Sequence, residues 1–548
     1  MSDHETSKPG GPSEAEPTPG VSRRAMLGGL SGLALAAGLP ARGTKPADAA
    51  AGDPRLARAY AVRTQAAAKL LGRGPTQHRA NGDEELYPDR AACFTKGLPH
   101  DEAGRVNPDS YRMYLRAIET GEQEAFHLLH LDAAARLANP QAAWAYDLIG
   151  PDASQPTVPA APRLDSAEQA AEMVELYWQA ELRDVPFSAY GRHPLAQAAA
   201  SELGGLSGFR GPRRDGVVTA DTLFRGPFAG DLVGPYVSQF LWHPMPWASI
   251  VVRPKTKTTA PGLDYLADYG DWLATQCGGM NGSNNFDGED RYIRTGRDLG
   301  EYVHRDISFQ PFLGACLVGF RLGCVVDKAN PYFLSRSETA FITHGAPFLF
   351  YLLGVVTQAA LKACWYQKWR VHRRLRPEEL GGRLEAHRRG LAELAVHADL
   401  TSSRSLARVV ERTGTSLLTQ AYPEGCPLHP AYPSGHAVIG GACATAVKTF
   451  LDESYPIPNP VVASEDGLSL EPYRGPELTV GGELDKLASN LAFGRNFAGI
   501  HWRSDGAEGL RLGEEVAIAV MEELATTTPE AFAGYRLRRF DGREVTIG

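Results

Sequence analysis

Three segments in the C-terminal part of the chain combine basic side chains, histidines and a glycine turn in a way that could hold an oxyanion. The first is KWRVHRRLRPEELGG, residues 368 to 382. Pro377 disfavours the helical conformation at the residue before it. We therefore expect a helix through Lys368 to end near Leu375, so that Arg376 turns back toward the face that carries Lys368. Basic clusters are usually solvated, and we assign three neighbours to a solvated face: His372, Arg373 and Arg374.

The second segment is HPAYPSGHAVIGG, residues 429 to 441. Ser434 offers a hydroxyl, Gly435 an approachable backbone N–H, and His436 an imidazole, and small apolar residues that favour a helix follow. A helix N-terminus presents unpaired N–H donors and a partial positive charge, which together attract anions. A tetrahedral oxyanion would therefore bind here. The alternative is that Ser434 is an ordinary N-cap.

The third segment is NLAFGRNFAGIHWRSDGAEG, residues 490 to 509. Arg495 falls at the end of an apolar helix, and His501 opens the next helix with Asp505 four residues on. That spacing places a carboxylate on the same helical face as the imidazole, where it can hold one ring nitrogen and aim the other. Such a pair suits a metal-binding or nucleophilic histidine. A surface His–Asp pair is the alternative.

Taken together, the order and spacing of the three segments resemble the signature shared by vanadium-dependent haloperoxidases and type 2 phosphatidic acid phosphatases. Within this group the chain is most similar to the bromoperoxidases of marine algae and their bacterial relatives. The similarity rests on the eight-residue step from Lys368 to Arg376, on residues 223–242 and 294–306, and on His429 five residues before the serine.

The resemblance implies a complete site. Vanadium would be bound by His501, whose orientation Asp505 sets. His436 would face the opposite apical oxygen as acid or base, and His429 would lie on the halide or proton path. The equatorial oxygens would be held by the remaining residues of the set: Lys368, Arg376, Ser434, the Gly435 N–H and Arg495. Three cations suit an anion of more than one charge.

The implied activity is that of a vanadate-dependent haloperoxidase. Such an enzyme uses hydrogen peroxide to oxidise bromide and iodide to hypohalous acid, which halogenates small organic acceptors. The alternative is an acid phosphatase in which the histidine at 501 forms a phosphohistidine. A third hypothesis is an exported anion-binding protein without catalysis. The resemblance also implies a homo-oligomer and allows structural calcium, for which the sequence places no ligands.

Composition and periodicity describe the scaffold. The 548 residues carry a net charge of −8 with a pI near 6.0, which argues against a nucleic-acid binder or a polybasic membrane-surface protein. Apolar residues at helical spacing predict a mainly α protein built from helical bundles, with the vanadate site in its C-terminal half. Predicted helices include residues 53–71, 124–138, 166–183, 346–374 and 513–525, and the few short strands include 249–253 and 544–548. The apolar run 346–356 is shorter than a membrane span requires, so we expect it in the core.

The N-terminus resembles an export signal. Arg23 and Arg24 precede a weakly apolar stretch from Met26 to Leu39, and small residues end near Ala49. This pattern is typical of a twin-arginine signal, which carries folded proteins to the periplasm or beyond. We therefore expect a signal peptide at 1–49 and one catalytic domain at 50–548, with the oxyanion site between residues 368 and 505.

Overall fold

The computed structural model describes residues 53–131, 135–279 and 282–548. The predicted signal peptide at 1–49 lies outside the described residues, so its boundary stays a prediction. The chain divides into two units, residues 1–63 and residues 64–548. The boundary falls within helix α2 (Pro54–Arg73), and the second unit contains all the residues of the predicted oxyanion site.

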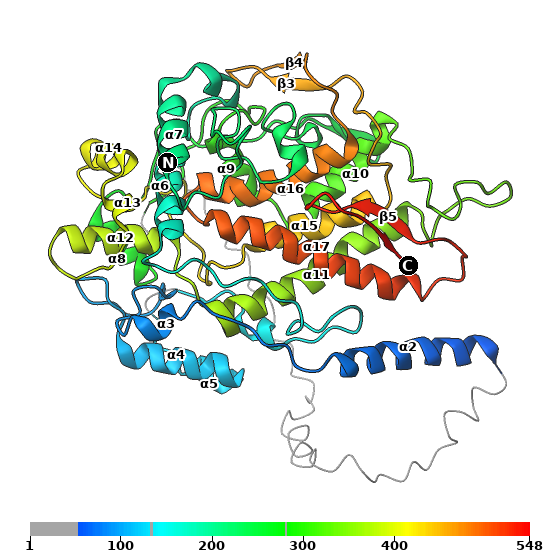
Figure 1. Ribbon diagram of the computed structural model, residues 1–548, viewed down its shortest axis with the longest axis horizontal. Coiled ribbons are helices and arrows are strands. Elements are labelled where there is room, and N and C mark those ends of the chain that lie inside the picture. The colour runs from blue at the N-terminus through cyan, green and yellow to red at the C-terminus, as the bar shows by residue number, and fades with distance from the viewer. Residues whose placement is uncertain (1–52, 132–134, 280–281) are drawn as a thin grey trace, which may run out of the picture. The chain divides into compact units, whose positions relative to one another are not determined.

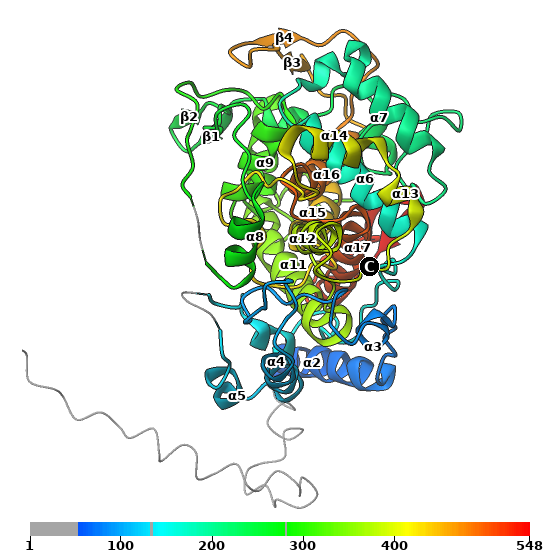
Figure 2. The same ribbon diagram turned by 90° about the vertical axis from the view of Figure 1, so that its left-hand side faces the viewer.

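Four helices form the centre of the larger unit: α11 (Ala346–Tyr366), α15 (Gly435–Lys448), α16 (Val480–Phe497) and α17 (Arg503–Ala525). They run side by side in Figure 1 and cluster end-on in Figure 2. Glycines let α15 and α17 approach closely. A Cβ at Gly441 would lie 2.0 Å from the carbonyl oxygen of Leu510, and one at Gly513 would lie 2.1 Å from that of Val438. These positions therefore exclude any larger residue unless the helices separate.

The remaining elements surround this centre. The other helices are α3 (Asp83–Leu86), α4 (Pro108–Thr120), α5 (Gln123–His127), α6 (Ala167–Glu181), α7 (Pro194–Gly205), α8 (Tyr269–Gln276), α9 (Gly296–Arg305), α10 (Gln310–Leu322), α12 (Pro377–Arg388), α13 (Ala398–Thr401) and α14 (Arg404–Thr413). Short 3-10 turns occupy Pro140–Trp144, Phe187–Arg192, Ala229–Leu232 and Gln239–Leu241. The described strands form antiparallel pairs: β1 (Met245–Trp247) with β2 (Ile250–Val252), β3 (Val461–Ala463) with β4 (Leu470–Pro472), and β5 (Tyr535–Arg538) with β6 (Glu544–Ile547).

The predicted mainly α class is confirmed, and the two predicted strands correspond to β2 and β6. The predicted helix at 124–138 is wrong for most of its length, because α5 ends at His127 and residues 135–138 are irregular. Among the described helices, only the segment Ala346–His372 is long and apolar enough to cross a membrane. Half of its most apolar window is buried inside the protein, as in the core helix of a bundle.

The chain bends sharply after α11. Residues Gln367–His372 form a π-helical segment, and Arg373 ends it with a φ of 40°. The helix therefore stops three residues before the predicted end at Leu375. Arg376 is extended, with φ −87° and ψ 158°, as expected for a residue before proline, and α12 starts at Pro377. The bend directs the residues that follow it back toward the end of the bundle at which α11 finishes.

Candidate oxyanion site

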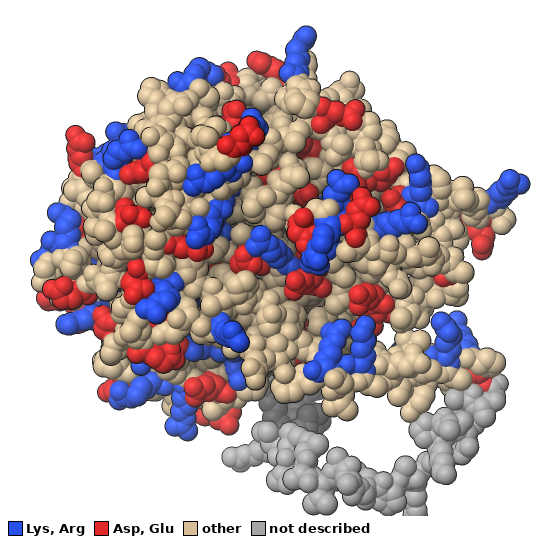
Figure 3. All heavy atoms as spheres, in the orientation of Figure 1, with Lys and Arg blue, Asp and Glu red and all other residues tan. Residues whose placement is uncertain are grey.

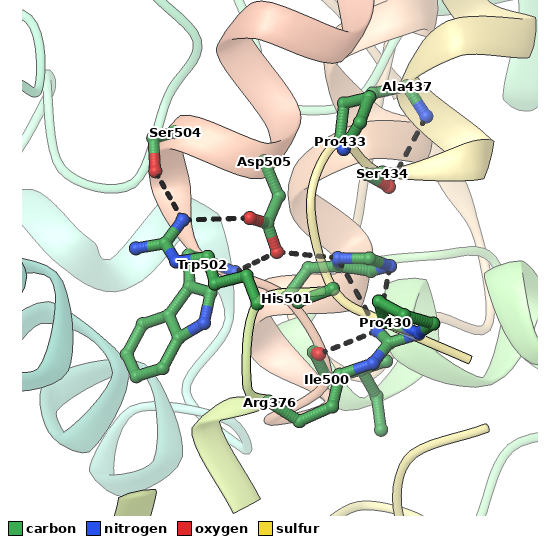
Figure 4. A network of polar contacts seen from close by, with 12 residues as sticks. Arg376, Pro430, Pro433, Ser434, Ala437, Ile500, His501, Trp502, Ser504 and Asp505 are labelled. Carbon is green, nitrogen blue, oxygen red and sulfur yellow. Dashed lines mark hydrogen bonds and ion pairs between the residues drawn. The ribbon is translucent and has the colours of Figure 1, made fainter. Parts of the chain in front are cut away.

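His501 and Asp505 form the pair that the sequence predicts. His501 lies just before α17, with Trp502 as the N-cap, and not inside the helix as expected. Its Nδ1 lies 2.8 Å from Oδ2 of Asp505, which also accepts the Trp502 N–H. Because a carboxylate accepts, Nδ1 carries the proton and Nε2 keeps its lone pair. Figure 4 shows the imidazole between Asp505 and Arg376.

The predicted solvent exposure of Arg374 is wrong. Its side chain is 3% exposed and is not part of a solvated face. It forms ion pairs with Oδ1 of Asp505 at 2.9 Å and with Glu172 on α6 at 2.7 Å. The bend after α11 turns this residue inward, where the two carboxylates compensate its charge. Arg374 therefore holds Asp505, which in turn holds His501.

The two neighbours of Arg374 are also removed from bulk solvent, so the predicted solvated face is wrong for the whole group. Arg373 forms an ion pair with Glu84 at 2.5 Å. His372 is partly buried, and burial together with nearby arginines lowers its pKa to about 3. The segment after α11 is thus largely buried, and Arg373 and Arg374 form ion pairs inside the protein.

Arg376 lies against two of the three predicted site histidines, His501 and His429. Nη1 is 3.0 Å from Nε2 of His501, and Nη2 is 2.9 Å from Nδ1 of His429. Nε donates to the His429 carbonyl at 3.0 Å, and Nη1 also contacts the carbonyl of Ile500 at 3.1 Å. Arginine only donates, so Nε2 of His501 presents a lone pair to it, whereas Nδ1 of His429 also lies 3.1 Å from the carbonyl of Pro430. Burial, with Arg376 and Lys368 nearby, lowers the pKa of each histidine well below its usual value.

Lys368 is fully buried in the π-helical segment. Its Nζ donates to the carbonyls of Pro430 and Ala431, each at 2.7 Å, in the loop that precedes Ser434. Burial, together with Arg376 and Arg495, lowers the pKa of this lysine to about 7. The bend thus places Lys368 and Arg376 against the same loop, as the sequence predicts.

Arg495 lies in the last turn of α16 and is 7% exposed. Its Nη1 donates to the carbonyl of Val303 at 3.1 Å, and its Nε has no hydrogen-bond partner among the described residues. The positive charge of Arg495 lowers the pKa of Lys368 and of His501, so the three groups lie within electrostatic reach of one another.

The PSGH turn starts α15 as predicted. Ser434 is the N-cap, and its hydroxyl lies 3.5 Å from the Ala437 N–H. Gly435 is the first helical residue, so its N–H belongs to the first turn, where helix donors have no intrahelical acceptor. His436 is the most open of these side chains, and its Nε2 lies 2.9 Å from Oδ1 of Asp306. Asp306 ends the segment 294–306, but no local sequence pattern marks it as a site residue.

The site has the donor set that an oxyanion requires. Within the described part of the chain, Lys368, Arg376 and Arg495 form no ion pair with any carboxylate. An unpaired buried cation is costly, and an anion would relieve that cost. Nε of Arg495 has no partner among the described residues, and the lone pair of His501 Nε2, which faces Nη1 of Arg376, becomes available to a ligand that takes over the arginine's hydrogen bond. The residues present therefore fit a vanadate anion held by cations and bound at one imidazole.

Calcium has no assigned ligands. Among the residues that the structure describes, no group of three or more His, Cys, Asp or Glu side chains could hold a metal ion.

Comparison with known proteins places this site in a family. A family model described as the VCPO second helical-bundle domain matches residues 348–528, which include every predicted site residue. The vanadium-dependent bromoperoxidase of Ascophyllum nodosum is 38% identical over 523 residues, covering 89% of this chain and 92% of that protein. The chain belongs to the vanadium-dependent bromoperoxidase family. The corresponding protein of Corallina pilulifera is 34% identical over 590 residues, covering 90% of this chain and 98% of that protein.

The fold of the family is also shared. The homohexameric structure of the second vanadate-dependent bromoperoxidase from Ascophyllum nodosum superimposes with a TM-score of 0.85 at 30% identity, covering 95% of each chain. Nothing in these comparisons favours the phosphatase alternative. The family assignment covers both the helical bundle and the segments that build the site.

The depressed pKa of Lys368 predicts a pH dependence of oxyanion binding. An oxyanion binds best to the charged ammonium, which the free protein loses as the pH rises through about 7. We expect the orthovanadate affinity to fall above that pH, by up to about tenfold per unit. Titration calorimetry between pH 6 and 9 measures this. Lys368→Met should remove the part of the pH dependence of affinity that comes from the lysine. An identical pH dependence in the two proteins would contradict the prediction.

Proposed function

We propose that this protein is a vanadate-dependent bromoperoxidase that uses hydrogen peroxide to oxidise bromide and iodide to hypohalous acid. The observation that carries the proposal is a set of three buried cations that have no carboxylate partner among the described residues, together with the unprotonated Nε2 of His501 that faces one of them, Arg376. The family membership supports the same reaction. Small organic acceptors would then be halogenated by the product.

The contacts support the following residue roles. His501 would bind vanadium through Nε2, and Asp505 would keep the proton on Nδ1. The vanadate oxygens would be held by donors from three segments: Lys368, Arg376, Ser434, the Gly435 N–H and Arg495. Bound vanadate would supply a Lewis acid that activates hydrogen peroxide toward attack by the halide. Lys368 in its ammonium form would donate a hydrogen bond to an oxygen of the bound group.

His436 is the proposed acid and base. Its contact with Asp306 fixes the ring, and because a carboxylate accepts, the proton of the neutral ring lies on Nε2. Nδ1 is then the atom that takes up and releases a proton. Nδ1 of His429 lies 2.9 Å from Nη2 of Arg376, and its ring centroid lies 5.1 Å from that of Trp365. We place His429 on the halide or proton path because the resemblance to the bromoperoxidases implies it.

An assay of two reactions tests the proposed function. The full-length protein is stripped of oxyanion and titrated with orthovanadate, and peroxide-dependent bromination of an activated diketone is followed. We expect activity to rise to a plateau near one vanadate per chain. Hydrolysis of a phenyl phosphate ester by the stripped protein, without bromination at any vanadate loading, would contradict the proposal.

We also propose that the protein is a homo-oligomer. Support comes from the homohexameric relative and from apolar side chains in the loop before α11. Leu334, Phe341 and Ile342 are 85%, 64% and 71% exposed, which is unusual for large apolar residues that stay in water. Positive and negative side chains are interspersed over the face in Figure 3. We therefore expect apolar contacts to contribute more to association than attraction between charged patches.

Removing the apolar side chains of this loop should dissociate the oligomer. We expect the double variant Phe341→Ser, Ile342→Ser to have a lower mass by light scattering than the wild type at equal concentration. Leu468→Ser, which changes an exposed leucine elsewhere, is the matched control and should keep the wild-type mass. An unchanged mass of the double variant would contradict this assignment of the contact.

Export through the twin-arginine route is the remaining part of the proposal. Arg23 and Arg24 with the following apolar stretch support it. Replacing both arginines by lysine should leave the protein in the cytoplasm of a bacterial host with its N-terminal segment uncleaved. Normal processing of this variant would contradict the assignment.

A further inference from the structure

The three cations of the oxyanion site share one feature: the groups that hold them are neutral. Lys368 is held by two carbonyls, and Arg376 by carbonyls and imidazoles. Several buried cations elsewhere pair with carboxylates, as Arg183 does with Asp264 and Lys96 does with Glu378. A carboxylate would compensate the charge of its partner, whereas a neutral acceptor fixes the side chain and leaves its charge for a ligand.

For Arg495 this neutral support is a tyrosine. Nη1 of Arg495 lies 3.3 Å from the hydroxyl of Tyr422, and the guanidinium carbon lies 5.4 Å from the centroid of the tyrosine ring. The distance to the ring is within the range of a cation–π contact. Arg495 has one other described acceptor, the carbonyl of Val303. Tyr422 therefore provides the side-chain contact that fixes the direction of this guanidinium.

Tyr422 is itself held in place. It is 1% exposed, and its hydroxyl donates to the carbonyl of Gly300 in α9. The ring of His304 stacks on it with centroids 3.7 Å apart and an interplanar angle of 10°. His304 in turn contacts Glu424 at 2.6 Å and Glu301 at 3.3 Å. The carboxylates of Glu301 and Glu424 thus contact His304, and among the described residues neither forms an ion pair with Arg495.

We propose that Tyr422, held by His304, is a positioning residue that directs the uncompensated charge of Arg495 at the bound oxyanion. This inference rests on the proposed function of the site. The tyrosine fixes one edge of the guanidinium by its hydroxyl and one face by its ring. The unpartnered Nε of Arg495 is left for the ligand.

Orthovanadate binding to the full-length, oxyanion-free protein tests the proposal by titration calorimetry, which does not depend on turnover. Tyr422→Phe keeps the ring and loses the hydroxyl contact, and we expect it to weaken binding roughly tenfold. Tyr422→Leu loses the ring as well and should weaken binding by roughly a further threefold or more. At saturating orthovanadate, kcat for bromide should stay within about threefold of wild type, because the tyrosine does not touch the reacting atoms.

Tyr177→Phe is the matched control. Tyr177 is also fully buried, and its hydroxyl donates to the Ser416 carbonyl at 2.5 Å, with no ring contact to a cation among the described interactions. It should bind orthovanadate with wild-type affinity. Wild-type affinity in Tyr422→Phe, or an equal loss in Tyr177→Phe, would overturn the proposal. The test measures binding and not turnover. A wild-type protein that binds orthovanadate without brominating would contradict the proposed function, but the role of Tyr422 in binding could still be tested.

Discussion

His501→Ala is expected to abolish orthovanadate-dependent bromination. Nε2 of His501 is a buried imidazole lone pair on a ring that a carboxylate fixes at the other nitrogen, Nδ1. Removal of an outer-shell partner of a metal ligand costs about 10- to 100-fold in affinity or activity. Loss of the ligand itself should cost more than that range. Bromination rate and orthovanadate affinity are measured in the same preparation.

Two comparisons make this result specific. Asp505→Asn keeps the ligand and removes the carboxylate that orients it, so its loss should fall within the outer-shell range. His397→Ala, which changes a histidine with a 39% exposed side chain away from the site, should bind and brominate like wild type. Full activity of His501→Ala, or equal losses in His501→Ala and Asp505→Asn, would contradict the assignment of His501 as the ligand.

Arg374→Ala is expected to lower the free energy of unfolding by about 3 kcal/mol or more. The substitution leaves Asp505 and Glu172 buried without the cation that both contact, and breaking a buried ion pair by removing one partner costs about 3–5 kcal/mol. Urea denaturation at pH 7 measures the effect. Arg163→Ala, which breaks an exposed pair with Asp165, is the control and should change stability little.

The loss in Arg374→Ala should depend on pH with a defined sign. Burial already raises the pKa of Asp505 in the wild type, and loss of the nearby Arg374 charge raises it further. The folded chain then binds more protons than the unfolded one, so the variant loses stability as the pH rises through that window. The difference from wild type should therefore be larger at pH 7 than near pH 5. A difference that grows on acidification would contradict the proposed role of Arg374.

Much of the site could be predicted from sequence because its signals are local. Pro377 fixes the extended backbone of Arg376, the Ser-Gly-His turn starts α15, and the four-residue spacing joins His501 to Asp505. Each of these depends on residues within a few positions of one another. The mainly α fold likewise follows from apolar spacing along single helices.

The remaining contacts join segments far apart in the chain, so no local pattern reports them. Arg374 was assigned to solvent because its partner Glu172 lies on α6, about two hundred positions away. Asp306 contacts His436, and Tyr422 contacts Arg495, although the two residues of each pair are also far apart in the sequence. The helix expected at 124–138 fails for a related reason, since helical propensity alone cannot sustain a segment whose apolar face is not packed as a helix.

A crystal structure of the full-length protein soaked with orthovanadate tests the central claim most directly. The account predicts one vanadium bound at Nε2 of His501, with its oxygens contacting Lys368, Arg376 and Arg495. The same soak of His501→Ala should show no vanadium bound to an imidazole at this position. Vanadium bound elsewhere in the wild type, or a site at which the three cations turn away from the ligand, would contradict the account.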